Sequence, residues 1–332
     1  MNQKINCPIC STSINSHNFL ESYISPYNKQ EYKLYECSDC FLQWWEPLKI
    51  ISEFYEEEIF DSYELFHKGI LKKLSKWHEP FFQYFHKKLK IKLLDVGCGD
   101  GRFIKHCREI GFEVWGIDFD KRSIETIKRN FRIETVFPLS LEEFYEYAQK
   151  KNLKFDVITF FEVLEHQDNP RNFLEMVKDI LNEKGWIAGS VPNRERLFAE
   201  IDWKYFHGDY PPHHFLRFSK NSLKNILKII GFSTVEVIPL NFSLWDVPSY
   251  IEKKIFGNLD NMKIKLKSII TRNKNTAKYM IEELKNITEI TPVTMLLMIL
   301  KFIRNFTLLP FALMYIGKLK GNGQSLYFQA QK

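Results

Sequence analysis

A loop with three glycines and two carboxylates follows the apolar segment "IKLLDV". The loop, "DVGCGDG", contains Gly97, Gly99 and Gly101 at alternate positions, with Asp95 and Asp100 beside them. A loop that binds a dinucleotide spaces its glycines as G-x-G-x-x-G and holds the pyrophosphate at the start of the next helix. Two carboxylates would repel that anion. The loop therefore favours a ligand that has no phosphate and carries a positive centre.

A third acid, Asp118, ends the next apolar segment, "FEVWGID". An acid about twenty residues beyond such a loop, at the end of the second strand, binds the hydroxyls of a ribose. S-adenosylmethionine has a ribose, no phosphate, and both a sulfonium and an ammonium group. The sequence therefore predicts S-adenosylmethionine as the cofactor.

Four of the six cysteines form two C-x-x-C pairs. The pairs are Cys7 with Cys10 and Cys37 with Cys40. In a reducing compartment such pairs bind zinc more often than they form disulfides, and four thiolates leave no open position for a catalytic water. We expect a structural zinc ribbon, with a hairpin between the two pairs.

Short apolar segments alternate with amphipathic ones through the middle of the chain. The expected strands are 91–96, 112–118, 155–161 and 185–192, and the expected helices are 101–111, 120–130, 169–185 and 219–231. This order predicts a doubly wound α/β fold with a Rossmann-like parallel sheet, whose ligand site lies beyond the carboxyl ends of the strands.

The segments "LLDVGCGDGRF", "VWGIDFD", "FDVITFFEVLEHQDNP" and "GWIAGSVPN" resemble, in this order, those of class I S-adenosylmethionine-dependent methyltransferases. The resemblance covers about residues 90 to 240, and the whole chain is similar to a branch that carries an N-terminal zinc ribbon. It implies a seven-stranded sheet with six parallel strands and an antiparallel last strand. The cofactor contacts that it implies are Asp95, Gly97, Gly99 and Gly101 in the loop, Asp118 at the ribose, Phe119 at the adenine, and Phe161 and Glu162 at the methionine end.

One segment departs from the family pattern, because the Gly-Asp that often precedes the adenine contact is missing before the fourth strand. Leu139 and Ser140 are the predicted substitutes. The expected domains are a zinc ribbon at 1–46, a helical linker at 47–89, the cofactor-binding domain at 90–242 and 323–332, and a helical insertion at 243–322.

The insertion contains the most apolar part of the chain, and Lys301, Arg304 and Pro310 interrupt it. These residues argue against a membrane span. We expect a helical cap that packs on the sheet domain or on a second copy, so that the protein is a monomer or a homodimer. The alternative is a peripheral membrane contact through residues 254–322. The N-terminus has no apolar stretch after its lysine, so the expected location is the cytoplasm, with membrane association as the alternative.

The base for methyl transfer is sought near the carboxyl ends of the strands. An oxygen acceptor must lose a proton, and the candidates are Glu165 and His166 after the fourth strand and His213 and His214 after the fifth. Glu165 and His166 also have a structural interpretation, as a carboxylate at the start of a helix and a histidine bonded to the backbone. In methyltransferases that resemble the ubiquinone O-methyltransferases, E-x-x-E-H can hold a divalent metal. Weaker candidates for substrate contacts are Asn193, Arg194, Trp203 and Tyr205.

The acceptor is predicted to be a small molecule or a glycan precursor, methylated on oxygen, although N- and C-methylation stay open. The net charge of +6 is spread along the chain, so no specific nucleic-acid partner is expected. The alternative function is a nucleic-acid-binding or scaffold protein that combines a zinc ribbon with a degenerate methyltransferase domain. The intact loop and Asp118 argue against it.

Overall fold

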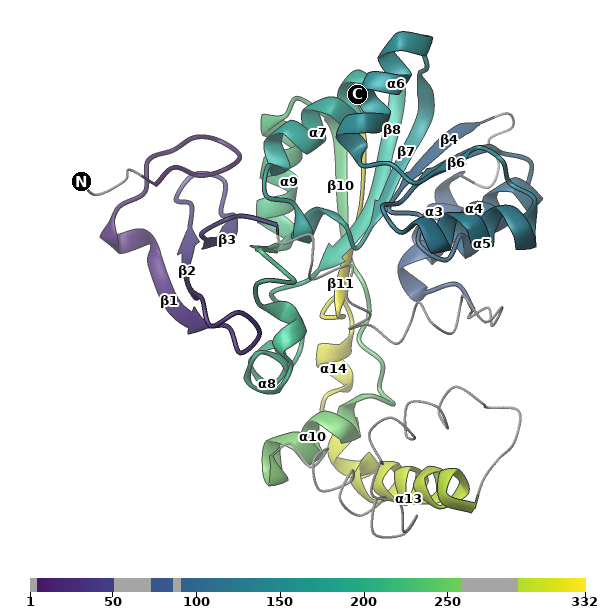
Figure 1. The fold of residues 1–332 in the computed structure, drawn as a ribbon. Coiled ribbons are helices and arrows are strands. Elements are labelled where there is room, and N and C mark those ends of the chain that lie inside the picture. Colours follow the sequence, from purple (N-terminus) through teal and green to yellow (C-terminus); the bar gives the residue numbers. More distant parts are fainter. Residues whose placement is uncertain (1–4, 51–72, 86–90, 258–291) are drawn as a thin grey trace. The chain divides into compact units, whose positions relative to one another are not determined.

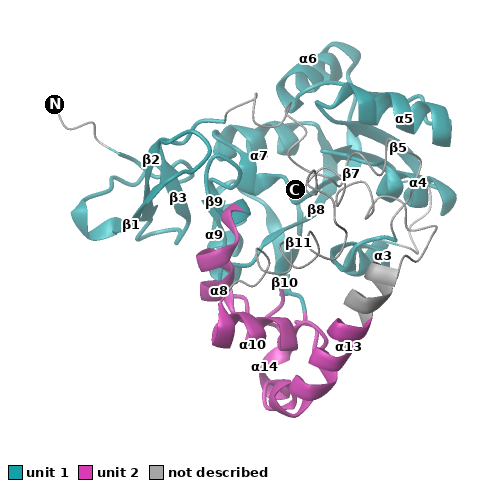
Figure 2. Cartoon of the chain, turned by 60° about the horizontal axis from the view of Figure 1, so that its bottom comes forward, with its two compact units in different colours: residues 1–195, 208–240, 324–332 teal, residues 196–207, 241–323 magenta. Residues whose placement is uncertain are grey.

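The computed structural model describes residues 5–50, 73–85, 91–257 and 292–332. The chain forms two compact units, which Figure 2 colours separately. The first unit contains residues 1–195, 208–240 and 324–332, and the second contains residues 196–207 and 241–323. Much of the expected helical linker, and residues 258–291 of the expected insertion, lie outside the described residues.

A seven-stranded sheet forms the centre of the first unit, with the order β10-β11-β8-β7-β4-β5-β6. Six strands run parallel, and β11 runs antiparallel to both of its neighbours. The strands are β4 (Lys92–Val96), β5 (Glu113–Ile117), β6 (Val136–Phe137), β7 (Phe155–Phe161), β8 (Leu181–Pro192), β10 (Ser233–Pro239) and β11 (Ser325–Gln331). The prediction of a Rossmann-like sheet with an antiparallel last strand is confirmed. The central strands β4 and β7 are buried almost throughout, as strands covered on both faces must be.

Helices cover both faces of this sheet (Figure 1). One face carries α3 (Glu79–Phe85), α4 (Arg102–Glu109) and α5 (Lys121–Phe131), and the other carries α7 (Pro170–Asp179) and α9 (Lys220–Ile229). The core between α3, α4, α5 and the sheet is rich in fully buried aromatic and branched side chains, among them Phe81, Phe85 and Ile127.

A further helix, α6 (Leu141–Lys151), follows β6 in a run for which the sequence analysis named no helix. Its N-terminus is a capping box. The Ser140 hydroxyl accepts from the backbone N–H of Glu143, and the Glu143 carboxylate accepts from the N–H of Ser140. The S-x-x-E spacing was the signal for this helix.

The N-terminal ribbon forms a four-stranded sheet of its own, with the order β1-β2-β3-β9. Strands β1 (Phe19–Ile24) and β2 (Glu31–Glu36) form the expected hairpin, and β3 (Gln43–Glu46) pairs antiparallel with β2. The fourth strand, β9 (Leu216–Arg217), comes from far along the chain, after β8. The ribbon sheet is therefore completed by a segment of the main domain, which the sequence analysis did not foresee.

The second unit is helical. It contains α8 (Ala199–Tyr205), α10 (Val247–Phe256), α13 (Pro292–Leu313) and α14 (Ile316–Leu319). A small apolar core around Phe242, Val247 and Ala312 joins α10 to α13, and Arg304 forms an ion pair of 2.9 Å with Glu252. Among the described residues, no helix is long and apolar enough to cross a membrane.

Candidate active site

The glycine loop turns tightly at the carboxyl end of β4. The backbone N–H groups of Gly97 and Cys98 both donate to the carbonyl oxygen of Ile117, at 2.8 and 3.0 Å, which ties the loop to the end of β5. Gly97 and Gly101 have φ angles of +75° and +69°. A Cβ at Gly97 would lie 2.6 Å from a methyl group of Val163. Both the left-handed backbone and the lack of space require glycine there.

Asp118 braces this loop from the end of β5. Its Oδ2 accepts from the N–H of Gly99 at 2.8 Å, and its Oδ1 accepts from the N–H of Asp120 at 2.9 Å. The carboxyl is buried, and burial raises its pKa to about 6 although these backbone bonds oppose the shift.

Asp95 lies at the end of β4, also buried, and its Oδ1 accepts from the Thr159 hydroxyl at 2.6 Å. Burial raises its pKa to about 8, and the nearby charges of Asp118 and Asp100 add to the shift. Three acids around one glycine loop would disfavour a pyrophosphate. A ligand with a positive centre would favour their ionised forms, so this donor set fits S-adenosylmethionine.

The other residues assigned to the cofactor lie at the ends of neighbouring strands. Phe119 lies two residues after the end of β5 and is 58% exposed, so its ring is accessible for stacking. Phe161 ends β7 and contacts the Phe103 ring edge to face, with the ring centroids 4.8 Å apart. Glu162 accepts from the Ser190 hydroxyl at 2.7 Å, and burial raises its pKa. Ser140 caps α6.

A cluster of three histidines brings together two distant segments of the sequence. His166 lies in a short 3-10 helix, η3 (Leu164–His166), whereas His213 and His214 lie in the loop before β9. The ring centroids of His213 and His214 are 4.4 Å apart, and that of His166 lies 4.6 and 4.8 Å from them. Four candidate catalytic residues from the sequence, Glu165 included, therefore lie in one place.

A hydrogen bond holds one of these rings, and a carboxylate lies beside another. The Nδ1 of His166 lies 2.7 Å from the carbonyl oxygen of His213; since a carbonyl only accepts, the ring N–H donates. The Nδ1 of His214 lies 3.4 Å from Oδ1 of Asp209, which belongs to another 3-10 helix, η4 (His207–Asp209). An imidazole whose Nδ1 faces a carboxylate presents its Nε2 for chemistry.

Burial lowers the pKa values of two histidines in this cluster and raises that of Glu165. It lowers the pKa of His166 to about 3 and that of His213 to about 2, with the charge of His214 adding to both shifts. The Glu165 side chain is fully buried, neither of its oxygens has a hydrogen-bond partner among the described residues, and burial raises its pKa well above the usual range. His166 and His213 are therefore weak bases, and Glu165 favours its neutral form.

Two groups of side chains are close enough to hold a metal ion. The first is the set of four ribbon cysteines, and the second is His166, His213 and His214; within each group the ligand atoms lie within 4.8 Å of one another. The Sγ atoms of Cys7 and Cys40 are 3.5 Å apart, and those of Cys10 and Cys37 are 3.4 Å apart. A tetrahedral zinc with Zn–S bonds of about 2.3 Å places its sulfurs about 3.8 Å apart. The cysteine group fits zinc, and none of its members is in a disulfide.

A family model described as "Methyltransferase domain" matches residues 66–237, which is more than half of the chain. The chain belongs to this methyltransferase family. The predicted class I S-adenosylmethionine-dependent methyltransferase is thereby confirmed, and the scaffold alternative is not favoured.

This methyltransferase is similar to several curated relatives and solved structures. A ubiquinone biosynthesis O-methyltransferase of Nitrosospira multiformis is 29% identical over 166 residues, 46% of this chain and 66% of that protein, just under two thirds of its length. One from Paraburkholderia phymatum is 25% identical over 224 residues, 65% of this chain and 89% of that protein. The crystal structure of an S-adenosylmethionine-dependent methyltransferase from Archaeoglobus fulgidus is 19% identical with a TM-score of 0.46, and covers 85% of this chain and 100% of that one.

Two residues close in sequence to His213 and His214 were not predicted as functional in this methyltransferase. Asp209 could have been predicted, because an acid shortly before two adjacent histidines is a candidate for orienting one of the imidazoles. Arg217 was harder to find, because its contacts depend on the pairing of β9 with the ribbon. Of the weaker candidates, Arg194 contacts the ribbon, where it donates to the carbonyl of Phe41 at 2.8 Å, and Trp203 and Tyr205 belong to the second unit.

Proposed function

We propose that this methyltransferase transfers a methyl group from S-adenosylmethionine to an oxygen of a small molecule or glycan precursor, with His214 as the general base. The observation that carries the proposal is the pair of His214 and Asp209 beside two histidines of low pKa. The names of the curated relatives, ubiquinone biosynthesis O-methyltransferases, support oxygen as the acceptor atom.

The cofactor supplies a methyl group that its sulfonium already activates. The protein then has to bind the cofactor and align the acceptor with the methyl group. We assign the loop of Asp95, Gly97, Gly99 and Gly101 to the methionine side, Asp118 to the ribose, and Phe119 to the adenine, with Leu139, Ser140, Phe161 and Glu162 beside them. Alignment of the acceptor within about 3 to 3.5 Å of the methyl carbon provides most of the acceleration.

The proton of an acceptor hydroxyl leaves toward Nε2 of His214. Asp209, at Nδ1 of the same ring, holds the ring in place and stabilises the imidazolium that forms. His166 and His213 remain neutral at physiological pH, because burial has lowered their pKa values far below 7. In this assignment they pack around His214, and Glu165 remains a neutral acid beneath them.

The acceptor and the base can be tested together. A tritiated-methyl transfer screen against nucleotide sugars, lipid-linked glycans and quinone precursors identifies the acceptor class. The His214→Gln variant is then expected to lose about 10² to 10⁴ in turnover while S-adenosylhomocysteine affinity stays unchanged. Wild-type turnover in this variant would move the base to another residue or indicate an acceptor that needs none.

We also propose that Cys7, Cys10, Cys37 and Cys40 hold one structural zinc. The sulfur separations support this ion, and four protein ligands exclude a catalytic role for it. The three histidines give the chain a second group with metal-ligand spacing, so metal analysis of the purified protein tests both sites at once.

A peripheral membrane contact is a second proposal, carried by the exposed face of α13. Phe302 and Phe306 in α13 are 71% and 70% exposed, and Met314, directly after this helix, is 80% exposed. The chain has no acidic residue between Pro292 and Gln324, whereas Lys301, Lys318 and Lys320 are basic. An apolar face among basic residues suits a surface of anionic lipid.

Vesicle sedimentation tests this membrane contact. Wild-type protein is expected to sediment with vesicles that contain an anionic lipid, and the double variant Phe302→Ser with Phe306→Ser is expected to stay in solution. A concentration-dependent dimer in sedimentation velocity, with no vesicle binding, would assign the face to a second copy instead.

A further inference from the structure

The loop that carries His213 and His214 is bonded to the zinc ribbon on one side and to η3 on the other. The residue after the histidines, Phe215, shows this most simply. Its N–H donates to the carbonyl of Glu165 at 2.9 Å, and its carbonyl accepts from the N–H of Trp45 in β3 at 3.0 Å. The next two residues form β9, which pairs only with β3 in the described sheets. In the part of the chain that the structure describes, no strand of the central sheet pairs with residues 210–217.

Side chains repeat this connection on either side of the histidine pair. Tyr210 precedes the pair and Arg217 follows it. The guanidinium of Arg217 lies over the rings of Trp45 and Tyr210, 5.0 and 4.8 Å from their centroids, and its Nη1 is 3.0 Å from Oε1 of Glu21 in β1. The Tyr210 ring also lies 4.3 Å from that of Tyr23, between centroids. Both ends of the loop thus rest on ribbon residues.

The two cysteine knuckles, Cys7–Cys10 and Cys37–Cys40, are also attached to the main domain. At each, an arginine of the main domain donates to a backbone carbonyl in or directly after the knuckle. Arg171 in α7 donates to the carbonyl of Ile9, between Cys7 and Cys10, at 2.6 Å. Arg194 donates to the carbonyl of Phe41, directly after Cys40, at 2.8 Å. Both carbonyls belong to turns whose shape a bound metal would fix.

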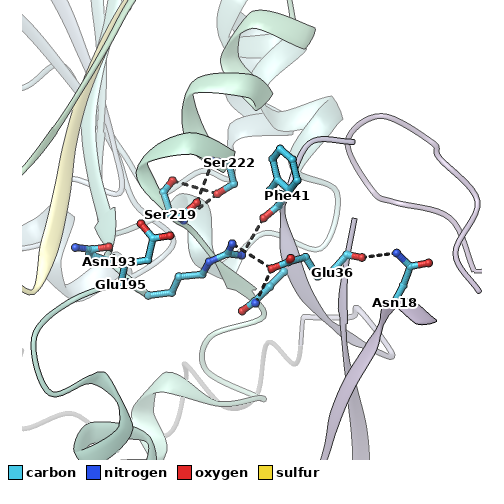
Figure 3. Close-up of polar contacts among 9 residues, drawn as sticks. Asn18, Glu36, Phe41, Asn193, Glu195, Ser219 and Ser222 are labelled. Carbon is cyan, nitrogen blue, oxygen red and sulfur yellow. Dashed lines mark hydrogen bonds and ion pairs between the residues drawn. The ribbon is translucent and has the colours of Figure 1, made fainter. Parts of the chain in front are cut away.

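Figure 3 shows the second of these attachments. Glu36 and Phe41 on the ribbon face the segment between Asn193 and Glu195, and Asn18 supports the end of β2 by donating to the carbonyl of Glu36 at 2.8 Å. Arg194 also forms an ion pair of 3.1 Å with Glu36. Asn193 forms a bridge with Phe218, so this attachment leads directly back to the end of β9.

Few residues connect the second cysteine knuckle to the histidine pair. The N–H of Cys37 donates to the carbonyl of Leu42 at 2.9 Å, which closes the second knuckle, and β3 begins at the next residue, Gln43. Leu42 and Trp45 are fully buried. The second cysteine pair is therefore joined directly to β3, which pairs with β9 and donates to the carbonyl of Phe215.

We infer that the ribbon is a positioning device for methyl transfer: its metal-bound form holds His213 and His214 in place through β3, β9 and the Arg217 stack. This inference rests on the proposed role of the histidine cluster. It goes beyond a structural zinc, because it predicts that metal occupancy and Arg217 affect turnover without affecting cofactor affinity. The positioning residues are Trp45, Tyr210 and Arg217.

The test compares the full-length protein with and without the ribbon metal. After treatment with a zinc chelator, turnover is expected to fall at least tenfold and to return when zinc is added back, while S-adenosylhomocysteine affinity in calorimetry stays within about twofold. Hydrogen exchange measured by mass spectrometry is expected to speed up in a peptide covering residues 209–217, and to stay unchanged in one covering 93–103. Wild-type turnover after confirmed loss of the metal would overturn the inference.

A second variant keeps the test valid where chelation unfolds the whole protein. Arg217→Met preserves much of the side chain's volume and removes its charge, so kcat is expected to fall about tenfold or more with unchanged cofactor affinity. Glu21→Gln, which removes only the exposed partner, is expected to have a smaller effect. Lys33→Gln, on an exposed position of the same ribbon sheet, is the matched control and should behave as wild type.

The failure of this inference differs from the failure of the proposed function. If His214→Gln is fully active, the general base is wrong, but a fall in kcat on chelation still supports positioning by the ribbon. If His214→Gln is inactive and both Arg217→Met and the metal-free protein turn over normally, the base stands and the ribbon has no positioning role.

Discussion

The Oδ1 of Asp209 lies 3.4 Å from Nδ1 of His214, although the two residues approach from a short helix and from the loop that follows it. In the proposed mechanism, the two adjacent histidines have different tasks. His214 has a carboxylate at Nδ1, whereas the pKa of His213 falls to about 2 in its buried setting. We therefore expect Asp209 to contribute to turnover through His214 alone.

Asp209→Asn is expected to lower kcat about 10- to 100-fold, because the amide cannot stabilise an imidazolium as a carboxylate does. Cofactor affinity should stay at the wild-type value. The diagnostic measurement is the double mutant with His214→Gln. If Asp209 acts through His214, adding Asp209→Asn to His214→Gln costs little further activity. A full multiplicative loss would show that the two residues act independently.

Asp118→Ala is expected to weaken S-adenosylhomocysteine binding by about 2 to 4 kcal/mol, measured by calorimetry. Two causes contribute: the ribose loses its charged partner, and Gly99 loses the carboxylate that orients its N–H. Asp118→Asn separates them, since an amide oxygen can still accept from Gly99 but carries no charge. Wild-type affinity in Asp118→Ala would refute the cofactor assignment.

The pKa of Asp95, raised from 3.8 to about 8, predicts how the stability of the cofactor-free protein depends on pH. A carboxyl with a raised folded pKa binds its proton more tightly in the native state than in the unfolded state. Its contribution to stability is therefore full below about pH 4 and is lost as the pH rises toward 8, by at most about 1.4 kcal/mol per pH unit.

Asp95→Asn removes this contribution, so urea denaturation at several pH values provides the comparison. The unfolding free energy of the wild type, relative to that of the variant, should decrease from pH 4 to pH 8. A difference that does not change with pH would show that Asp95 titrates normally.

Purified protein is expected to contain one zinc per chain in plasma emission spectrometry. Changing any one of the four ribbon cysteines to Ser should abolish that zinc and unfold the ribbon, because so small a sheet depends on the ion for its stability. Cys98→Ser is a suitable comparison, since Cys98 is buried outside the ribbon and should leave the zinc content unchanged. A second equivalent that survives loss of a ribbon cysteine would locate a metal at the three histidines.

The parts of the fold that follow local rules could be predicted from the sequence. The strands β4 and β7 are continuous apolar runs, the glycine loop needs its positive φ angles, and Asp118 follows at a fixed spacing, so each was visible in a few residues. β9 could not be predicted. It is two residues long and becomes a strand only because β3, more than 150 residues earlier in the sequence, pairs with it.

The candidate site divides in the same manner. The histidines and the glutamate after strands four and five were recognisable in the sequence as candidate bases. The sequence did not show which of them the proposed mechanism would use. The pKa values of His166 and His213 fall because of burial that several distant segments create, and only the three-dimensional arrangement shows that Asp209 lies 3.4 Å from Nδ1 of His214. In the proposed mechanism, His214 is distinguished from its neighbours by long-range packing rather than by spacing along the chain.

The most direct test of the central claim is the pH dependence of kcat for His214→Gln and wild type, with the acceptor that the methyl-transfer screen identifies. If His214 is the base, the variant loses about 10² to 10⁴ in kcat at neutral pH, and this loss shrinks as the pH rises through the pKa of the acceptor hydroxyl, because an ionised acceptor needs no base. Equal kcat values for the two proteins at neutral pH, or a loss that stays constant across that range, would contradict it.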